Sequence, residues 1–451
     1  MANAVESGFR EKTPRSAELF ERASRLFPSG VTHDSRYLTP YPIFVERALG
    51  ARKWDVDGNE YVDYFGGHGA LLLGHSHPEV AEAVAEQVCN GTHFGASHEL
   101  EVAWAEQVVD MVPAAEKVRF TASGTEASML GFRLARACTG RNKILRLAEH
   151  FHGWHDQVIG DGVALPSGVP AGIADTQVVC PANDIDAVSE ALAADRDIAA
   201  VVLEPTGATF GKIPATRDFL VQLRAVTEQH GVLLIFDEVI AGFRVSRGGA
   251  QAYYGITPDM TFLAKILAGG QPGGAVVGRA DILDGMSMRP DDPAWNASER
   301  VSHAGTYNAN PVSAVAGLTT LKIVATTDAN ERANRTGAAI RDGMNEVVRE
   351  LGLNWIVYGE FSGFHILPNS DPDVTADDLY SGKGAPAAIK RSTVPAGMTH
   401  LLRTGMIANG VDLLGWPGGM VSAVHTEEDV DRTIAAFRAT ATELAPVAAA
   451  S

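Results

Sequence analysis

Three short segments place polar residues beside apolar, strand-like runs. The segment Arg119–Ala127 (RFTASGTEA) predicts a strand, a glycine turn and a helix, and the free N–H groups at such a helix start suit a phosphate. Ile235–Val239 (IFDEV) places Asp237 where an apolar strand ends, at the edge where α/β proteins bind ligands. Leu263–Leu267 (LAKIL) surrounds Lys265 with apolar residues, a costly position unless the amine is paired or chemically used. Taken singly, the turn is a weak signal whose more common explanation is a helix cap, and Asp237 has the alternative of capping the next turn.

Taken together, the three segments match the requirements of pyridoxal phosphate (PLP). This cofactor needs a Schiff-base lysine, an anionic partner for its pyridinium nitrogen and a cup for its phosphate. The separation between Asp237 and Lys265 is 265 − 237 = 28 residues, which leaves room for one helix and a return to a neighbouring strand. The combination is far more specific than any of its parts.

The elements that must position these residues alternate between strand-like and helical segments, which predicts an α/β protein with a mostly parallel central sheet. The expected buried strands include the runs Val118–Phe120, Ala199–Leu203, Val232–Phe236 and Met260–Ala264. We predict three parts: residues 1–59 as an N-terminal arm packing with the small domain, 60–320 as a large PLP-binding domain, and 321–451 as a C-terminal small α+β domain.

Composition excludes several other classes of protein. The chain has 451 residues, 45% of them hydrophobic, and 37 basic against 55 acidic residues give 37 − 55 = −18, a charge that argues against nucleic acid as a partner. Three widely spaced cysteines and the lack of a long apolar run predict a cytoplasmic protein without a membrane partner. A zinc site built on His150, His152 and His155 is an alternative, but the helical HExxH pattern is missing, and we expect no metal.

The motifs of nearly the whole chain resemble those of class III (fold type I) PLP aminotransferases. The N-terminal half resembles glutamate-1-semialdehyde 2,1-aminomutase in Gly30-Val31 with Arg36, Trp54–Asn59 and Gly74–Pro78. Closer similarity to D-phenylglycine aminotransferase is carried by Phe65–Ala70, His152–Asp156, Ser362–His365 and Gly410–Asp412. The resemblance implies the fold type I architecture, with a large sheet domain and a smaller α+β domain.

The resemblance also implies roles for individual residues. Lys265 would form the Schiff base and move a proton, and Asp237 would pair with the pyridinium nitrogen. Phe151 stands where relatives carry tyrosine and would stack on the cofactor ring, with Val239 on its opposite face. The other residues assigned to the cofactor are His152, the phosphate-binding Ser123, Gly124 and Thr125, and Thr306, which would reach the phosphate from the neighbouring subunit of a homodimer.

Three further residues are candidates for binding substrate. Arg36 occupies the position of the arginine that meets the substrate carboxylate in the aminomutases, and a guanidinium suits that group; the alternative is a solvated surface arginine. His68 lies between glycine-rich turns and could line the same pocket. Glu204, in a Leu-Glu-Pro motif at a strand end, is assigned either to the active site or to a structural role.

These features predict a ping-pong transaminase that moves an amino group between an amino acid and a 2-oxo acid, with a D- or β-aromatic amino acid as a candidate substrate. The alternative is internal amino transfer of the glutamate-1-semialdehyde aminomutase type. Two departures from the aminomutases favour the first: Pro417 replaces their glutamate, and residues 160–166 (GDGVALP) differ from their mobile gate. A regulator that keeps the pocket without turnover is a further alternative, against which stands the presence of both Lys265 and Asp237.

Overall fold

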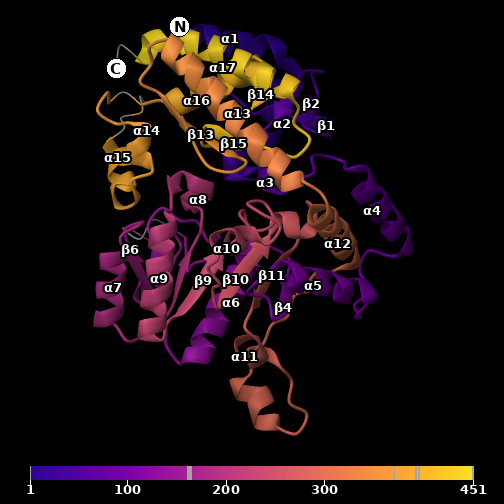
Figure 1. Cartoon of the computed structure of the whole chain (residues 1–451). Helices are drawn as coiled ribbons and strands as arrows, with labels where there is room; N and C mark the ends of the chain where they lie inside the picture. The colour runs from indigo at the N-terminus through magenta and orange to yellow at the C-terminus, as the bar shows by residue number, and fades with distance from the viewer. Residues whose placement is uncertain (1, 160–164, 370, 392–393, 395–396, 449–451) are drawn as a thin grey trace. The chain divides into compact units, whose positions relative to one another are not determined.

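The computed structural model describes residues 2–159, 165–369, 371–391, 394 and 397–448. Within it the chain forms two compact units (Figure 1). Unit 1 contains Met1–His77, Ala329–Asp378 and Ala387–Ser451, and unit 2 contains Pro78–Asp328 and Leu379–Pro386. The boundaries expected after residues 59 and 320 therefore lie after residues 77 and 328. The first shifts because strand β3 (Glu60–Asp63) pairs with β14 (Val411–Asp412) of the C-terminal region.

Unit 2 is built on a seven-stranded sheet with the order β4-β11-β10-β9-β7-β5-β6. Its strands are β4 (Lys117–Thr121), β5 (Lys143–Leu147), β6 (Gln177–Cys180), β7 (Ile198–Leu203), β9 (Leu233–Asp237), β10 (Met260–Ala264) and β11 (Gly274–Gly278). Neighbours from β10 to β6 pair in parallel, and β11 is antiparallel to both β10 and β4. Strands β7 and β9 are buried along their whole length, as expected of central parallel strands with covered faces. The predicted mostly parallel sheet is confirmed.

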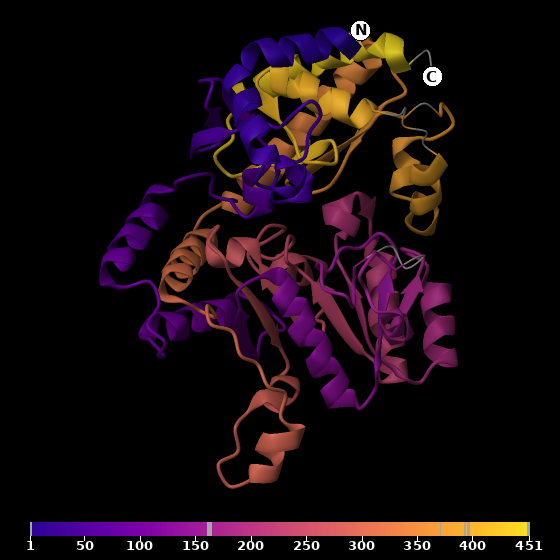
Figure 2. The ribbon, with the colours of Figure 1, turned by 180° about the vertical axis from the view of Figure 1, so that it is seen from behind.

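Helices cover both faces of this sheet. The described helices of unit 2 are α4 (Pro78–Asn90), α5 (Glu99–Met111), α6 (Gly124–Thr139), α7 (Ile185–Ala194), α8 (Ala208–Gly211), α9 (Arg217–His230), α10 (Gly249–Tyr254), α11 (Ala280–Leu283) and α12 (Pro311–Thr326), with a two-residue strand β8 (Ile213–Pro214) after α8. Figure 1 shows α9 in front of the sheet, and Figure 2, seen from behind, shows α6 in front of it. Gly131 lets α6 approach β10 closely, since a Cβ there would lie 2.1 Å from Phe262 Cε1.

Unit 1 combines the N-terminal and C-terminal parts of the chain around two small sheets, with orders β1-β2-β3-β14 and β12-β13-β15. The remaining strands are β1 (Val45–Leu49), β2 (Arg52–Asp55), β12 (Ile356–Tyr358), β13 (Gly363–Leu367) and β15 (Gly418–Met420). Its helices are α1 (Ala2–Lys12), α2 (Pro14–Ser24), α3 (Gly66–Gly69), α13 (Ala329–Glu350), α16 (Met398–Ala408) and α17 (Glu427–Ala448), while α14 (Ala376–Leu379) and α15 (Ala385–Arg391) lie near the unit boundaries.

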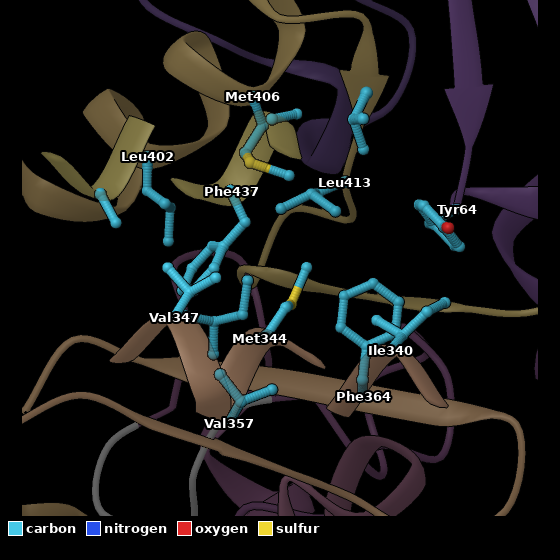
Figure 3. Packing of buried hydrophobic residues seen from close by; sticks show 14 of the residues in the cluster. Tyr64, Ile340, Met344, Val347, Val357, Phe364, Leu402, Met406, Leu413 and Phe437 are labelled. Atoms are coloured by element: carbon cyan, nitrogen blue, oxygen red, sulfur yellow. The ribbon is translucent and has the colours of Figure 1, made fainter. Parts of the chain in front are cut away.

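Side chains from helices and strands far apart in the sequence form the core of unit 1. Figure 3 shows Met344 of α13, Phe364 of β13, Met406 of α16 and Phe437 of α17 gathered in one cluster. Tyr64, which directly follows β3, belongs to the same cluster and meets Phe364 edge-on, with ring centroids 5.1 Å apart. The first residues of the chain and the C-terminal region thus share one apolar core.

Candidate functional site

The three sequence segments meet at one edge of the unit 2 sheet. Phe262 of β10 pairs with Asp237 of β9, and the Glu238 N–H donates to the Phe262 carbonyl at 2.9 Å. Asp237 ends β9, and Lys265 follows the last residue of β10. Both side chains therefore stand at the carboxyl ends of adjacent parallel strands, where ligands bind in open α/β sheets.

Ser123 lies at the same edge of the sheet, as the pairing of the antiparallel strand β11 with its two neighbours shows. Gly274 of β11 pairs with Ala264 on one side and with Thr121 on the other. A Cβ on Gly274 would lie 2.5 Å from the Ser123 carbonyl oxygen, so the turn can pass this close only because residue 274 has no side chain.

Asp237 is buried, with 5% of its surface exposed, and has two partners. Its Oδ2 lies 2.8 Å from His152 Nδ1, and its Oδ1 accepts from the Val239 N–H at 3.1 Å. His152 is also buried, and its Nε2 has no hydrogen-bond partner among the described residues. The carboxylate is therefore held in a fixed orientation by a histidine 85 residues earlier, a contact that the sequence did not reveal.

The loop that carries His152 is attached to its neighbours mainly through its backbone. The Phe151 N–H donates to Glu204 Oε1 at 3.0 Å, and the His152 carbonyl accepts from Ser128 Oγ at 2.5 Å. Gly153 has φ 117°, and a Cβ there would lie 3.0 Å from Thr125 Oγ1. Phe151 itself is 63% exposed, so its ring is free to contact a ligand.

Lys265 occupies an uncommon backbone conformation, with φ 54°, which for a residue with a side chain is a strained position typical of functional sites. Its side chain is partly accessible. Desolvation lowers the pKa of Lys265, although the charges of Asp237 and Glu204 oppose this shift. A lowered pKa favours the neutral amine, which is the nucleophilic form.

The start of α6 offers backbone donors beside these groups. Ser123 caps the helix, because its Oγ accepts from the Glu126 N–H at 3.2 Å. The N–H groups of Gly124 and Thr125, in the first turn of α6, have no helical carbonyl to donate to. They can therefore donate to a bound anion. Because Ser123 Oγ is the acceptor in this cap, its O–H remains a donor for the expected contact with phosphate, which stays a prediction. A Cβ on Gly124 would come within 2.9 Å of Val239 Cγ2.

Two buried glutamates stand close to Asp237. Glu204 accepts from the Phe151 and Thr209 N–H groups, each at 3.0 Å; burial, reinforced by the charge of Asp237, raises its pKa to about 7. Glu238 accepts from Ala250 N–H at 2.6 Å and from the side-chain amide of Gln251 at 2.9 Å. Burial likewise raises the pKa of Glu238 to about 7.

Sequence reasoning missed Glu238, together with Ser128 and Gly153. The sequence signal that could have identified Glu238 as part of the site was its position directly after Asp237. Ser128 was marked by its place four residues after Gly124, which sets both on one face of α6.

The other predicted residues are Arg36, His68 and Thr306. Arg36 and His68 belong to unit 1; Arg36 is exposed and donates to Thr32 Oγ1 at 2.9 Å. Thr306 is exposed in the loop before α12. Within the described parts of the chain, no hydrogen bond connects Thr306 to the Ser123–Thr125 turn, so its assignment to a neighbouring subunit's phosphate stays a prediction. The gate comparison at 160–166 rests mainly on residues 160–164, which lie outside the described residues.

The edge of the unit 2 sheet fits PLP by its own geometry. Free N–H groups at Gly124 and Thr125 suit its phosphate, the buried Asp237 suits its pyridinium nitrogen, and the partly accessible Lys265 amine suits its aldehyde. Gly153 lies close to Thr125, and because it has no side chain it does not obstruct the Ser123–Thr125 turn. When bound, PLP withdraws electrons from the substrate carbon that loses a proton.

Comparisons with known proteins agree with the class of PLP-dependent enzyme that this geometry defines. The family model described as Aminotransferase class-III matches residues 34–353, and the chain belongs to that family. It is 39% identical over 443 residues to a glutamate-1-semialdehyde 2,1-aminomutase from Methanopyrus kandleri, covering 95% of this chain and 98% of that protein.

Solved structures of transaminases are also similar. An omega-transaminase from Sphaerobacter thermophilus is 35% identical with a TM-score of 0.84, and the match covers 95% of this chain and 97% of the other. A transaminase with PLP bound is 33% identical with a TM-score of 0.85, covering 97% and 99%. The chain is thus a fold type I enzyme whose cofactor is pyridoxal 5'-phosphate, as the sequence predicted. No described helix is long and apolar enough to cross a membrane.

Proposed function

We propose that the chain transfers amino groups with PLP attached to Lys265 and with Asp237 as the partner of the pyridinium nitrogen. The observation that carries this proposal is the placement of both groups at the ends of adjacent parallel strands. Lys265, whose pKa is lowered by desolvation, would accept and return the proton at the substrate carbon. His152 would keep the Asp237 carboxylate oriented through their 2.8 Å contact.

For the mode of transfer, we propose internal amino transfer on glutamate semialdehyde as the first activity to test. The relative from Methanopyrus kandleri is 39% identical across nearly the full length of both chains and is named a glutamate-1-semialdehyde 2,1-aminomutase. Its name supports internal transfer over the two-substrate transamination that the sequence motifs favoured. In this mode the amino group moves from carbon 2 to carbon 1 of one molecule, and no second substrate is consumed.

Two-substrate transamination, with a D- or β-aromatic amino acid as donor, is the second candidate. Pro417 favours it, because a proline side chain has no carboxylate to replace the aminomutase glutamate. In the structure the Pro417 carbonyl accepts from the Ile366 N–H at 2.8 Å, so this residue helps to hold β13. The similarity to a solved omega-transaminase supports the same mode.

One experiment separates the two modes. The PLP-loaded protein is incubated with glutamate semialdehyde alone, and separately with D-phenylglycine or β-phenylalanine plus 2-oxoglutarate. Formation of the carbon-1 amine without an added oxo acid supports internal transfer. Release of more than one equivalent of aromatic oxo acid per enzyme when 2-oxoglutarate is present supports transamination, since repeated turnover needs the acceptor. Turnover in neither mixture contradicts both proposals.

We also propose that the enzyme is a homodimer in the cytoplasm, with Thr306 of each subunit completing the other subunit's phosphate site. The exposed position of Thr306 is compatible with such a role. Threonine-to-alanine replacement there should weaken PLP binding without changing the fold, and sedimentation should give twice the mass of the chain.

A further inference from the structure

The loop from Val301 to Asn310 presents Thr306 between two fixed ends. At its start, the buried Val301 donates its N–H to the Gly285 carbonyl at 2.9 Å. At its end, Asn310 caps helix α12. Residues 304–307 between these ends are exposed, so the contacts next to them decide how Thr306 is held.

Two arginines hold the start of this exposed segment. Arg119, on β4, donates through Nε to His303 Nδ1 at 3.0 Å and through Nη2 to the His303 carbonyl at 3.2 Å. Arg133, on α6, donates to the Ser302 carbonyl at 3.3 Å. Strand β4 and helix α6 flank the Ser123–Thr125 turn, so the two elements that position this turn also hold the loop that carries Thr306.

Arg119 is committed to this loop. Within the described parts of the chain, the hydrogen bonds of its side chain both go to His303, and it forms no ion pair with a carboxylate there. Desolvation and the charge of Arg300 lower the pKa of Arg119, and the charge of Glu101 only partly opposes this effect. Its two acceptors on His303 are therefore the contacts that stabilise this partly buried cation, and they fix His303 in turn.

His303 can accept from Arg119 only as a neutral imidazole, because the protonated ring has no free nitrogen. Desolvation lowers the pKa of His303, and the charges of Arg119 and Arg133 act in the same direction, whereas the charge of Glu126 opposes them. The lowered pKa keeps the accepting form at neutral pH. With Nδ1 as the acceptor, the ring proton is on Nε2.

The Nε2 side of the His303 ring faces Asn308, which closes a turn around Thr306. His303 Nε2 lies 3.5 Å from Asn308 Nδ2, and the buried Asn308 Oδ1 has no partner among the described residues. Turning the amide over would bring this oxygen to the Nε2 proton. The Asn308 N–H donates to the Gly305 carbonyl at 3.2 Å, and a Cβ on Gly305 would overlap the Asn308 side chain. The position of Thr306 is thus linked through Asn308 and His303 to Arg119.

We infer that Arg119 and His303 are positioning residues, which hold Thr306 where it can reach the phosphate of the neighbouring subunit's cofactor. This inference rests on the proposed role of Thr306 in a homodimer and adds the residues on which that role depends. Arg119 acts through His303, and His303 acts through the turn that carries Thr306.

The test measures how much Thr306 contributes to PLP affinity in different variants. Each full-length protein is titrated with PLP, with and without Thr306→Ala, and the two Kd values are compared. In the wild type, Thr306→Ala should raise the Kd about tenfold, as expected for a hydrogen bond to a charged phosphate. In Arg119→Met the same change should raise the Kd less than about threefold, because Thr306 is no longer held. A merely structural role of Arg119 would weaken PLP binding equally with and without Thr306 and leave this ratio unchanged.

Two variants of His303 separate its hydrogen bond from its bulk. His303→Asn keeps an acceptor for Arg119 and should keep the effect of Thr306→Ala, whereas His303→Leu has no acceptor and should lose it. Arg247→Met is the matched control, because Arg247 is another exposed arginine of unit 2 that donates to a loop carbonyl, that of Thr327, at 2.9 Å. The effect of Thr306→Ala should be unchanged in this control.

The outcomes distinguish the inference from the proposal on which it rests. A wild type whose Kd does not change with Thr306→Ala would overturn both the proposed role of Thr306 and this inference. A full effect of Thr306→Ala that persists in Arg119→Met or in His303→Leu would overturn the inference alone. Loss of the effect in His303→Asn or in Arg247→Met would do the same. If Arg119→Met does not fold, the two His303 variants decide by themselves.

Discussion

Replacing Glu204 by glutamine should stabilise the protein increasingly as the pH rises from about 4.5 to above 7. Burial and the charge of Asp237 raise the pKa of Glu204 from the ordinary 4.5 to about 7 in the folded protein. Between these values the folded form holds a proton that the unfolded form has lost. The wild type therefore loses stability as the pH rises through this window, whereas glutamine does not titrate.

The magnitude follows from the two pKa values. Each pH unit between them corresponds to about 1.4 kcal/mol, so the ionised Glu204 costs the folded state about 3 kcal/mol above pH 7. Glutamine keeps one oxygen for the Phe151 and Thr209 N–H groups but loses the acceptor for the Phe210 N–H, a long contact of 3.4 Å. That loss lowers the stability of the variant equally at every pH and leaves the pH dependence unchanged.

The assay is urea unfolding of wild type and Glu204→Gln, both without cofactor, at several values from pH 5 to pH 8. The difference in unfolding free energy, variant minus wild type, should rise by about 2 to 3 kcal/mol over this range. A difference that stays constant or falls would refute the assignment of Glu204 as a buried, titrating carboxylate.

Glu238→Gln is the matched control for the link to Lys265. Glu238 also has a pKa raised to about 7, but the charges acting on Lys265 are those of Asp237, Glu204 and Arg244. Removing the Glu204 charge should lower the pKa of Lys265 further, so that PLP attaches at lower pH than in the wild type. Glu238→Gln should leave the pH dependence of attachment unchanged, and an equal shift in both variants would contradict the electrostatic link.

Three further changes have defined outcomes. His152→Phe removes a partner of the buried Asp237 carboxylate. Since a hydrogen bond to a charged group contributes about 1.5–3 kcal/mol, a PLP titration should show that the affinity for PLP is reduced by about tenfold or more. An unchanged affinity would contradict this role of His152. Gly131→Ala forces a Cβ to within 2.1 Å of Phe262 and should cost about 1–3 kcal/mol in thermal unfolding, whereas Gly8→Ala, with open space around it, should cost nothing. Arg36→Ala should raise KM for carboxylate substrates more than it lowers kcat with an amine that lacks a carboxylate; equal effects would remove Arg36 from that role.

The central sheet and the positions of Lys265 and Asp237 could be predicted because local patterns determine them. Val232–Phe236 was expected as a strand, and the structure has β9 at Leu233–Asp237. Met260–Ala264 was expected and found as β10. A continuous apolar run that ends in a polar residue is a feature of sequence neighbours, so it is visible without the fold.

The contacts that tune the site could not be predicted in this way. The pairing of His152 with Asp237 joins residues 85 positions apart and depends on the order of strands in the sheet. Ser123 Oγ also caps α6 by accepting from the Glu126 N–H, and its O–H remains a donor for the expected contact with phosphate, which stays a prediction. Arg403 carried no signal, because only the tertiary structure shows that its side chain is buried and that its Nε has no hydrogen-bond partner among the described residues.

The most direct test of the account is to locate the lysine that holds the cofactor. The protein is loaded with PLP, reduced with borohydride to make the attachment permanent, digested and analysed by mass spectrometry, with Lys265→Ala treated in parallel. The account predicts a pyridoxyl group on the peptide that contains Lys265 and its loss in the variant. A pyridoxyl group on another lysine, or none on the loaded wild type, would contradict the central claim.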